Sequence, residues 1–465
     1  MDNNLSSRQV LFAKLAINFD EVSIEQLADY TAVEYYLTVA DESSPDSTNL
    51  EKVSCYLEAF HHLCEVKDWQ RGRMVLSTPM DTPAHQELDD QLSTWGYYQE
   101  KIELYGRLLG KLDSPFDSVL LNGLANAFFA MGDYDQAMEY HFQGLENDKK
   151  LGNFHGIATS LLNLGVVYYC QGNYPKAIQY QEQSLIMMQQ LRDLDGQAKI
   201  FGNLGNVYHD KSDYATAMDY YQRSLNIVRQ LNDREGEMKC LGSLGVCCKN
   251  TKAYKKAIEY YEQSLAIADK LESRQNQGKA LGNLGSVYFL LKDYEKARNY
   301  YEQRLIIALE IKDKEGELAV RGNLGNIFFR SENYPKAIEH YQKSLELITA
   351  IGKRLEEALV LLDLGSAYTS LKEYNQAIYH YEQSLTILQT LGYPRAEKVV
   401  LRNLEIVYDH LGDDTKVAEY YQRRLIISMQ LFIKNTLNWL WHLLTKPVNL
   451  IKRYLRHEVK TLDKK

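Results

Sequence analysis

The chain lacks long hydrophobic runs, and several other common features are missing with them. None of its 465 residues lies in an uninterrupted apolar stretch long enough to cross a bilayer as a helix. The first residues, MDNNLSSRQV, lack the basic and then apolar order of a signal peptide. Six cysteines form neither a disulfide framework nor a CxxC pair, which favours a reducing compartment. We therefore expect a cytoplasmic protein.

Excess positive charge and catalytic motifs are also lacking. The net charge of −9 argues against general nucleic-acid binding. The sequence contains no P-loop, no zinc-binding helix motif and no nucleophile elbow. His61, His62 and Cys64 suggest metal ligands, but adjacent histidines point to different sides of a helix and no second cluster follows. We expect no cofactor, no metal and no enzymatic activity.

What the sequence does contain is a repeat of 40 residues, in fixed register from residue 121 to residue 430. Position 1 is residue 121 in the first copy and residue 401 in the eighth. Leucine recurs at position 4 of every copy, at 124, 164, 204, 244, 284, 324, 364 and 404. A fixed period of this length is typical of a stacked-repeat solenoid, which offers a long binding surface.

Each copy predicts two helices. Phe201, Leu204 and Tyr208 follow helical spacing, and Asp213 then stands where a helix N-cap is expected. The spacing predicts a first helix from about position 33 of one copy to position 11 of the next, and a second from about 14 to 31.

These motifs resemble the tetratricopeptide repeat. Leu-Gly-x-x-Tyr, followed by Ala and an aromatic residue at fixed offsets, is its pattern. The segment Gly322-Asn323-Leu324-Gly325-Asn326 is similar to the 40-residue repeats of spindle-orientation adaptors and kinesin light chains, and to the repeat regions of bacterial signalling ATPases. The resemblance implies an all-α fold, a right-handed α-solenoid of stacked helical hairpins.

The sequence divides into four regions. Residues 1–50 form an acidic helical segment and linker, and residues 51–120 predict divergent, TPR-like helical hairpins. The eight regular repeats occupy residues 121–430, and residues 431–465 form a basic amphipathic tail.

Residues 22–40 faintly resemble a helix-turn-helix, with a turn at Ala32. No Lys or Arg lies between Lys14 and Lys52, however, while nine Asp and Glu do. A DNA-reading helix needs basic residues for the phosphates, so a helical cap or a relic of a winged-helix fold is favoured.

We expect the binding surface on one face of the first helix of each repeat. Advancing about 100° per residue places positions 2, 3, 6 and 10, with positions 35 and 39 of the preceding copy, towards the hollow of the superhelix. The candidate peptide-binding residues there are Asn163, Asn203, Asn283 and Asn323 at position 3, Asn126, Asn206 and Asn326 at position 6, Lys199, Lys239 and Lys279 at position 39, and Arg330 at position 10.

An amide side chain both donates and accepts hydrogen bonds, so these asparagines suit the backbone of an extended peptide. The resemblance implies a similar role for the three asparagines at position 6. Two alternatives stay open. The asparagines could instead join neighbouring repeats, and Lys199 and Lys239 could form i,i+4 ion pairs with Asp195 and Glu235, as on any solvated helix.

The tail has the opposite charge to the rest of the chain. Residues 431–465 carry +6, while the remainder carries −15. Apolar residues fall on more than one side of the predicted helix, and exposed apolar surface usually indicates contact of some kind. The candidate contact residues are Phe432, Trp439, Trp441, Leu443, Lys452 and Arg453. A cap on the solenoid, a membrane surface and self-association or partner docking all remain open.

Together these features predict an interaction scaffold or adaptor for a peptide or protein partner, with an acidic partner favoured by the lysines. Two other classes are a receptor whose bound peptide reshapes the superhelix, and a membrane-surface assembly factor. A detached regulatory half of an ATPase or protease is a further reading, because one repeat fold serves many functions.

Overall fold

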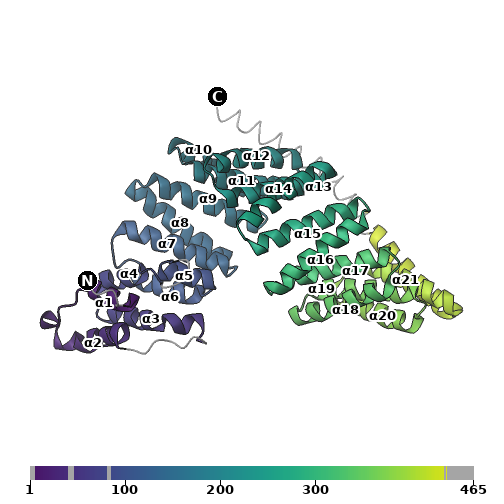
Figure 1. Cartoon of the computed structure of the whole chain (residues 1–465), viewed down its shortest axis with the longest axis horizontal. Helices are drawn as coiled ribbons and strands as arrows, with labels where there is room; N and C mark the ends of the chain where they lie inside the picture. Colours follow the sequence, from purple (N-terminus) through teal and green to yellow (C-terminus); the bar gives the residue numbers. More distant parts are fainter. Residues whose placement is uncertain (1–5, 40–46, 81–84, 434–435, 437–465) are drawn as a thin grey trace, which may run out of the picture. The chain divides into compact units, whose positions relative to one another are not determined.

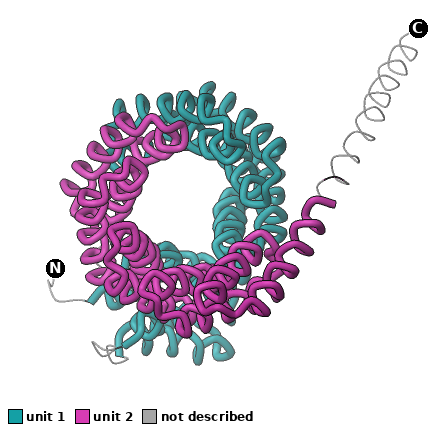
Figure 2. The backbone as a smooth tube through the Cα atoms, turned by 90° about the vertical axis from the view of Figure 1, so that its right-hand side faces the viewer, with its two compact units in different colours: residues 1–240 teal, residues 241–465 magenta. Residues whose placement is uncertain are grey.

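A computed structural model describes residues 6–39, 47–80, 85–433 and 436. Apart from an isolated bridge between Pro79 and Glu87, every regular element in this part of the chain is helical (Figure 1), which confirms the predicted fold class. None of the described helices is long and apolar enough to cross a membrane. The chain divides into two compact units, residues 1–240 and residues 241–465 (Figure 2).

The first unit begins with irregular helices and continues with regular hairpins. Its irregular elements are α1 (Ser7–Leu15), a 3₁₀ turn (Phe19–Glu21), α2 (Ile24–Thr38), α3 (Asn49–Glu65), α4 (Trp69–Leu76), α5 (Leu88–Trp95) and α6 (Tyr98–Leu108). Its regular elements are α7 (Ser114–Ala130), α8 (Tyr134–Leu151), α9 (Phe154–Cys170), α10 (Tyr174–Gln190), α11 (Leu194–Asp210) and α12 (Tyr214–Gln230).

The helix-turn-helix interpretation of residues 22–40 is wrong. Helix α2 runs unbroken through Ala32. Tyr30, Val33 and Leu37 are buried and spaced three and four residues apart, so one apolar stripe continues past the expected turn. Neither glycine nor proline interrupts the helix there.

The second unit consists of regular hairpins. Helix α13 (Arg234–Asn250) crosses the boundary between the units. It is followed by α14 (Tyr254–Lys270), α15 (Arg274–Leu290), α16 (Tyr294–Glu310), α17 (Lys314–Arg330), α18 (Tyr334–Ile351), α19 (Arg354–Ser370), α20 (Tyr374–Leu391) and α21 (Pro394–Leu411). Residues 414–433 are also helical.

Side-chain caps set the helix boundaries close to the predicted positions. The Asp213 carboxylate accepts a hydrogen bond of 3.2 Å from the amide of Thr216, and Asp233 accepts one of 2.9 Å from the amide of Gly236. Each cap satisfies one of the backbone donors left open at a helix start. Helix α11 therefore spans positions 34 to 10, and α12 spans positions 14 to 30.

The two helices of a regular hairpin meet where a glycine faces a tyrosine ring. A Cβ atom added to Gly325, at position 5, would lie 2.5 Å from the Cε1 atom of Tyr341, at position 21. The same pairing, with a Cβ 2.5 to 2.8 Å from the ring, joins Gly205 to Tyr221, Gly245 to Tyr261, Gly285 to Tyr301 and Gly365 to Tyr381. A glycine inside a helix costs about 1 kcal/mol relative to alanine, and close packing against the ring accounts for it here.

A second ring contact lies beside the first. Aromatic residues at positions 8 and 20 stack with their centroids 5.3 to 5.5 Å apart and their planes within 20° of each other. The pairs are Phe128–Tyr140, Tyr168–Tyr180, Tyr208–Tyr220, Tyr288–Tyr300, Phe328–His340, Tyr368–His380 and Tyr408–Tyr420. Many of the chain's 35 tyrosines are thus structural, as the repeat pattern predicts.

Three copies depart from the glycine–tyrosine pattern, and the second does so at one position only, since Gly165 is retained and faces Gln181. In the first copy Ala125 replaces the glycine and the smaller ring of His141 replaces the tyrosine. In the eighth copy Glu405 stands at the glycine position, and its carboxylate accepts hydrogen bonds of 2.6 and 2.9 Å from Arg424. An ion pair therefore takes the place of the glycine–tyrosine contact in the final hairpin.

A second series of glycines has no such contact. Gly202, Gly242, Gly282 and Gly322 occupy position 2 of consecutive copies. A Cβ atom on Gly242 or Gly322 would find no heavy atom within 4 Å, and one on Gly202 or Gly282 would only reach a side chain at 4.0 Å. Packing within the described structure therefore does not require glycine at position 2.

These two series predict opposite effects of the same substitution. We expect Gly325→Ala to destabilise the protein by about 2 kcal/mol, because a methyl group there overpacks the ring of Tyr341. Gly322→Ala is expected to be neutral, or to stabilise by up to about 1 kcal/mol, because alanine is the better helix former. Urea unfolding of the full chain measures both. Equal effects at the two positions would contradict the proposed basis for the position-5 glycines.

Candidate functional site

Three of the predicted peptide-binding residues line one pocket in the second unit. Lys279, Asn283 and Asn323 surround a cavity of about 320 Å³ between α15, α16 and α17. Gly282 and Ser286 line it as well, so positions 39, 2, 3 and 6 lie on one surface, here called the groove face. Ligand sites usually occupy pockets of about 300 to 1,000 Å³.

The amides of Asn283 and Asn323 are available to a ligand. Both side chains are half-buried, and neither makes a hydrogen bond with any residue that the structure describes. An asparagine amide supplies two donors and one acceptor oxygen. Two of them, one repeat apart, can therefore meet the alternating donors and acceptors of an extended backbone.

The asparagines at position 6 have an internal partner. The hydroxyl of Tyr221 donates to the Oδ1 atom of Asn206 at 2.7 Å, and Tyr341 donates to Oδ1 of Asn326 at 2.8 Å. These tyrosines are the rings that pack on the position-5 glycines. The side chains at position 6 thus help to fix the hairpin, whatever else they contact. Asn126 in the first copy is exposed.

The other predicted residues of the first unit differ among themselves. The Nδ2 atom of Asn163 donates to Oδ1 of Asn122 at 3.0 Å, which joins neighbouring repeats. Asn122 occupies position 2, where the next six copies carry leucine or glycine, so this bond cannot recur in them. Asn203 is half-buried beside Gly202 and makes no side-chain hydrogen bond within the described part of the chain.

The basic residues also differ. Lys199 pairs with Asp195 at 2.6 Å and Lys239 pairs with Glu235 at 2.8 Å, and all four side chains are more than half exposed. Exposed i,i+4 pairs of this kind contribute only about 0.3 to 0.5 kcal/mol. Lys279 lines the pocket instead. Arg330 is exposed in the last turn of α17.

Among the pocket residues that the sequence analysis did not predict, Arg304 is the charged one. Position 24 carries serine in most copies, and Ser184, Ser224 and Ser384 donate to backbone carbonyl oxygens of the preceding repeat at 2.6 to 2.8 Å. Arg304 interrupts this series, a signal that the aligned copies contain. Its side chain is only 9% exposed.

The Arg304 guanidinium has one carboxylate partner. Its Nη2 atom donates to the Oδ2 atom of Asp313 at 2.5 Å. The amide of Gly316 also donates to Asp313, and together with Arg304 it holds the pKa of that carboxyl below its ordinary range. Nη1 is buried and has no hydrogen-bond partner among the described residues.

Asp363 occupies position 3 where other copies carry asparagine. Burial raises the pKa of this carboxyl from 3.8 to about 6, because the surroundings penalise the charged form. The rings of Tyr341 and Tyr381 lie close enough to feel its charge. The groove face therefore contains one acid that is partly protonated near pH 6.

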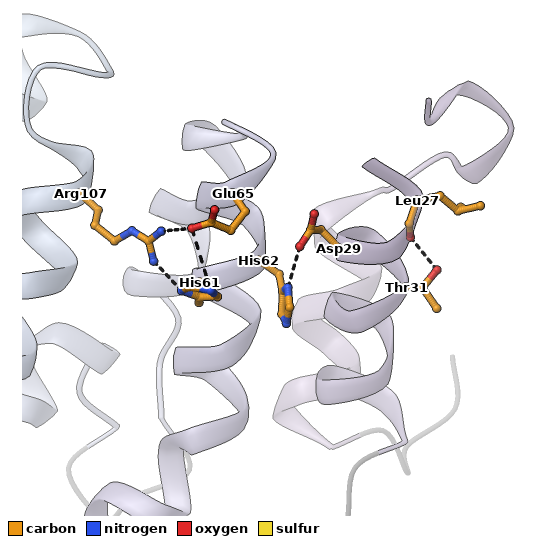
Figure 3. A network of polar contacts seen from close by, with 7 residues as sticks. All are labelled: Leu27, Asp29, Thr31, His61, His62, Glu65 and Arg107. Atoms are coloured by element: carbon orange, nitrogen blue, oxygen red, sulfur yellow. Dashed lines mark hydrogen bonds and ion pairs between the residues drawn. The ribbon is translucent and has the colours of Figure 1, made fainter. Parts of the chain in front are cut away.

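The histidine pair of α3 belongs to a polar network in the first unit (Figure 3). Arg107 donates to Nδ1 of His61 at 2.7 Å and also contacts Glu65, whereas Nδ1 of His62 donates to Asp29 at 2.8 Å. The two rings have separate partners on separate helices. No three His, Cys, Asp or Glu residues in the described ranges lie together as a metal site would require.

Most of the predicted tail contacts lie outside the described residues: Trp439, Trp441, Leu443, Lys452 and Arg453. Phe432 is described and 71% exposed. It belongs to a row of exposed apolar side chains on the final helix that includes Leu425, Ile426, Met429 and Ile433.

Sequence comparison identifies the family. The tetratricopeptide repeat profile matches residues 116–190, 196–270, 241–310, 276–350 and 316–390, which together cover more than half of the chain. The chain belongs to the tetratricopeptide repeat family. No curated protein matches it significantly over its sequence.

Solved structures share the fold at low sequence identity. A signal transduction ATPase with numerous domains and a tetratricopeptide repeat sensor, PH0952 from Pyrococcus horikoshii, has a TM-score of 0.60 at 14% identity, covering 94% of this chain and 74% of that one. The apo quorum sensor NprR from B. thuringiensis has a TM-score of 0.53 at 16% identity, covering 82% of this chain and 100% of that one. BtubC from P. vanneervenii is 22% identical over 46% of this chain and 90% of its own, with a TM-score of only 0.43.

Asp363 makes stability depend on pH. Its folded-state pKa is raised, so its contribution to stability is complete below about pH 4 and is lost as the pH rises through about 6. Asp363→Asn removes the titrating group and restores the residue found in other copies. We expect the variant to be more stable than the wild type by about 2 to 3 kcal/mol at pH 7.5, with a much smaller difference at pH 4.5. Urea unfolding at the two pH values tests this, and a pH-independent difference would contradict it.

Proposed function

We propose that the protein is a non-enzymatic scaffold that binds an extended peptide segment of a partner on the groove face of its second unit. The observation that supports this proposal is that a glycine at position 2 directly precedes an asparagine at position 3 whose side chain makes no hydrogen bond with the described residues. Gly282 and Gly322 adjoin Asn283 and Asn323 along the chain, and Asn283 and Asn323 line one pocket.

The energetics favour a ligand as the reason for these glycines. Each costs about 1 kcal/mol of helix stability relative to alanine, and no internal contact at Gly242 or Gly322 offsets that cost. Glycine lets another backbone approach closely. An extended peptide over position 2 would use that access and would hydrogen-bond to the amides at position 3.

Two similar structures are compatible with this function. NprR is a quorum sensor, and PH0952 carries a tetratricopeptide repeat sensor. At 14 to 16% identity they share the fold only, so the sensor role is a second candidate for this chain. A sensor would change shape when a peptide binds, and small-angle scattering with and without peptide separates it from a static scaffold.

The groove proposal predicts a selective loss of affinity. Peptides selected by the full chain from a random library should bind Asn283→Ala/Asn323→Ala at least about tenfold more weakly, because each lost hydrogen bond in a buried contact costs about 1 to 3 kcal/mol. Adding methyl groups with Gly282→Ala/Gly322→Ala should also weaken binding by blocking backbone approach. Titration calorimetry measures the affinities.

The matched control is Gln263→Ala, which truncates an exposed amide on α14. It should leave the affinity unchanged. A large loss of stability in the double asparagine variant would show that those side chains stabilise the repeats. Unchanged affinity with unchanged stability would move the binding surface away from the groove face.

The apolar row on the final helix supports a second contact surface. Met429, Phe432 and Ile433 are each more than half exposed, and the basic segment 431–465 follows or includes them. We propose that this end of the chain contacts an anionic membrane surface, because apolar and basic side chains together favour that interface.

Truncation after Gln430 should abolish co-sedimentation with anionic vesicles and leave helicity per residue almost unchanged. Phe432→Ser/Ile433→Ser in the full chain should weaken it, while neutral vesicles should bind neither form. If truncation unfolds the repeats, the segment is a cap; if it converts a dimer to a monomer, the segment is a self-association surface.

A further inference from the structure

The pocket beneath the groove face contains a buried cation that its own repeat does not fully satisfy. Arg304 comes from the second helix of its hairpin, α16, and reaches under the first helix, α15, which carries Lys279 and Asn283. Buried polar groups normally have hydrogen-bond partners, so an unpaired donor calls for an explanation. The Nη1 atom of Arg304 is such a donor.

The surrounding residues are adapted to this arginine. A Cβ atom on Gly278 would lie 2.1 Å from Nη1, and one on Gly316 would lie 2.0 Å from Nη2. Gly278 stands at position 38, where Ala158, Ala198 and Ala358 accept the hydrogen bonds of the serines through their carbonyl oxygens. Serine has thus become arginine and alanine has become glycine at the two facing positions of one hairpin, which opens space for a guanidinium.

The other arginine at position 24 shows what an internally satisfied arrangement looks like. Arg424 directs Nε and Nη2 at the two carboxylate oxygens of Glu405. Arg304 meets one oxygen of Asp313 through Nη2 alone. Asp313 also receives the amide of Gly316, because it caps α17. Its charge is therefore shared between two donors.

The balance of charge around the pocket is positive. Arg304 and Lys279 supply two cations against the single carboxylate of Asp313, while the nearby acids Glu310 and Glu317 pair with Arg274 and Arg321 respectively. Arginine binds carboxylates through parallel, charge-assisted hydrogen bonds. A carboxylate in the pocket would balance the second cation, and a turn of the guanidinium would give Nη1, which is buried in its present position, the acceptor that it lacks.

We propose that this pocket is a carboxylate-binding subsite, in which Arg304 and Lys279 hold a carboxylate of the bound peptide while Asn283 and Asn323 hold its backbone. This inference rests on the proposed function, which it deepens by naming the chemistry of the partner. The carboxylate is either the C-terminus of the peptide or an Asp or Glu side chain, and the test separates the two sources.

The test uses the full chain and peptides that it selects from a random library. Each peptide is compared with one form that carries a C-terminal amide and another in which Gln and Asn replace Glu and Asp. One of the two modified forms should bind at least about tenfold more weakly, which corresponds to 1.4 kcal/mol. The form that loses affinity identifies the source of the carboxylate.

Protein variants then locate the subsite. Arg304→Ser installs the residue of the other copies and should remove the preference for the carboxylate form, so that the peptide and protein changes are strongly non-additive. Lys279→Gln should reduce the preference. Asp313→Asn retains a good helix cap but frees the guanidinium, so it should tighten binding of the carboxylate form. Arg298→Ser, at a half-exposed arginine of the same helix, is the control and should change nothing.

Each outcome decides the proposal. If all three peptide forms bind the wild type within about twofold, or if the effects of Arg304→Ser and of the peptide change simply add, the subsite does not exist. The groove proposal still stands in that case if Asn283→Ala/Asn323→Ala weakens every form alike. If Arg304→Ser fails to fold, Asp313→Asn and the peptide series on the wild type decide the matter. If the chain selects no peptide, the proposed function and the subsite fail together.

Discussion

In five consecutive hairpins, from the third copy to the seventh, a tyrosine ring lies directly on a glycine of the facing helix. A methyl group on that glycine would lie about 2.5 Å from the ring, so the helices can approach this closely only where the Cβ atom is absent. The ring then carries its hydroxyl to position 6, and a second pair of rings stacks alongside. Helix spacing, side-chain placement and the exposure of position 3 all follow from this approach.

The contact is replaced by other pairs towards both ends of the repeat array. Ala125 faces a smaller ring, and Glu405 faces an arginine. In the fifth copy a different pair of positions has changed, and a serine–alanine hydrogen bond has given way to an arginine among glycines. Repeats contact only their neighbours, so one hairpin can exchange a structural pair for a polar pocket while adjacent hairpins keep theirs.

The architecture could be predicted well because the period of the repeat can be read directly from the order of residues along the chain. Regular leucines, caps such as Asp213 and helical spacing sufficed to place the helix boundaries within one or two residues. The false turn at Ala32 arose from a short local resemblance, and only the buried stripe through Tyr30 and Leu37 shows a continuous helix. The amides at position 3 could be assigned to one face, but their hydrogen bonds could not be predicted. Asn163 has a partner and Asn283 has none among the described residues, because partners depend on residues a repeat away.

The two series of glycines distinguish positions that pack the repeats from positions that are free to contact a ligand. Residues at positions 5 and 21 are constrained by packing between the two helices of a hairpin, whereas the position-2 glycines of the third to sixth copies face space that no close packing contact fills. Single substitutions at position 2 can therefore change what the surface recognises without disturbing the packing of the repeats. In this architecture the stability of the fold places little constraint on the evolution of a new binding specificity at these positions.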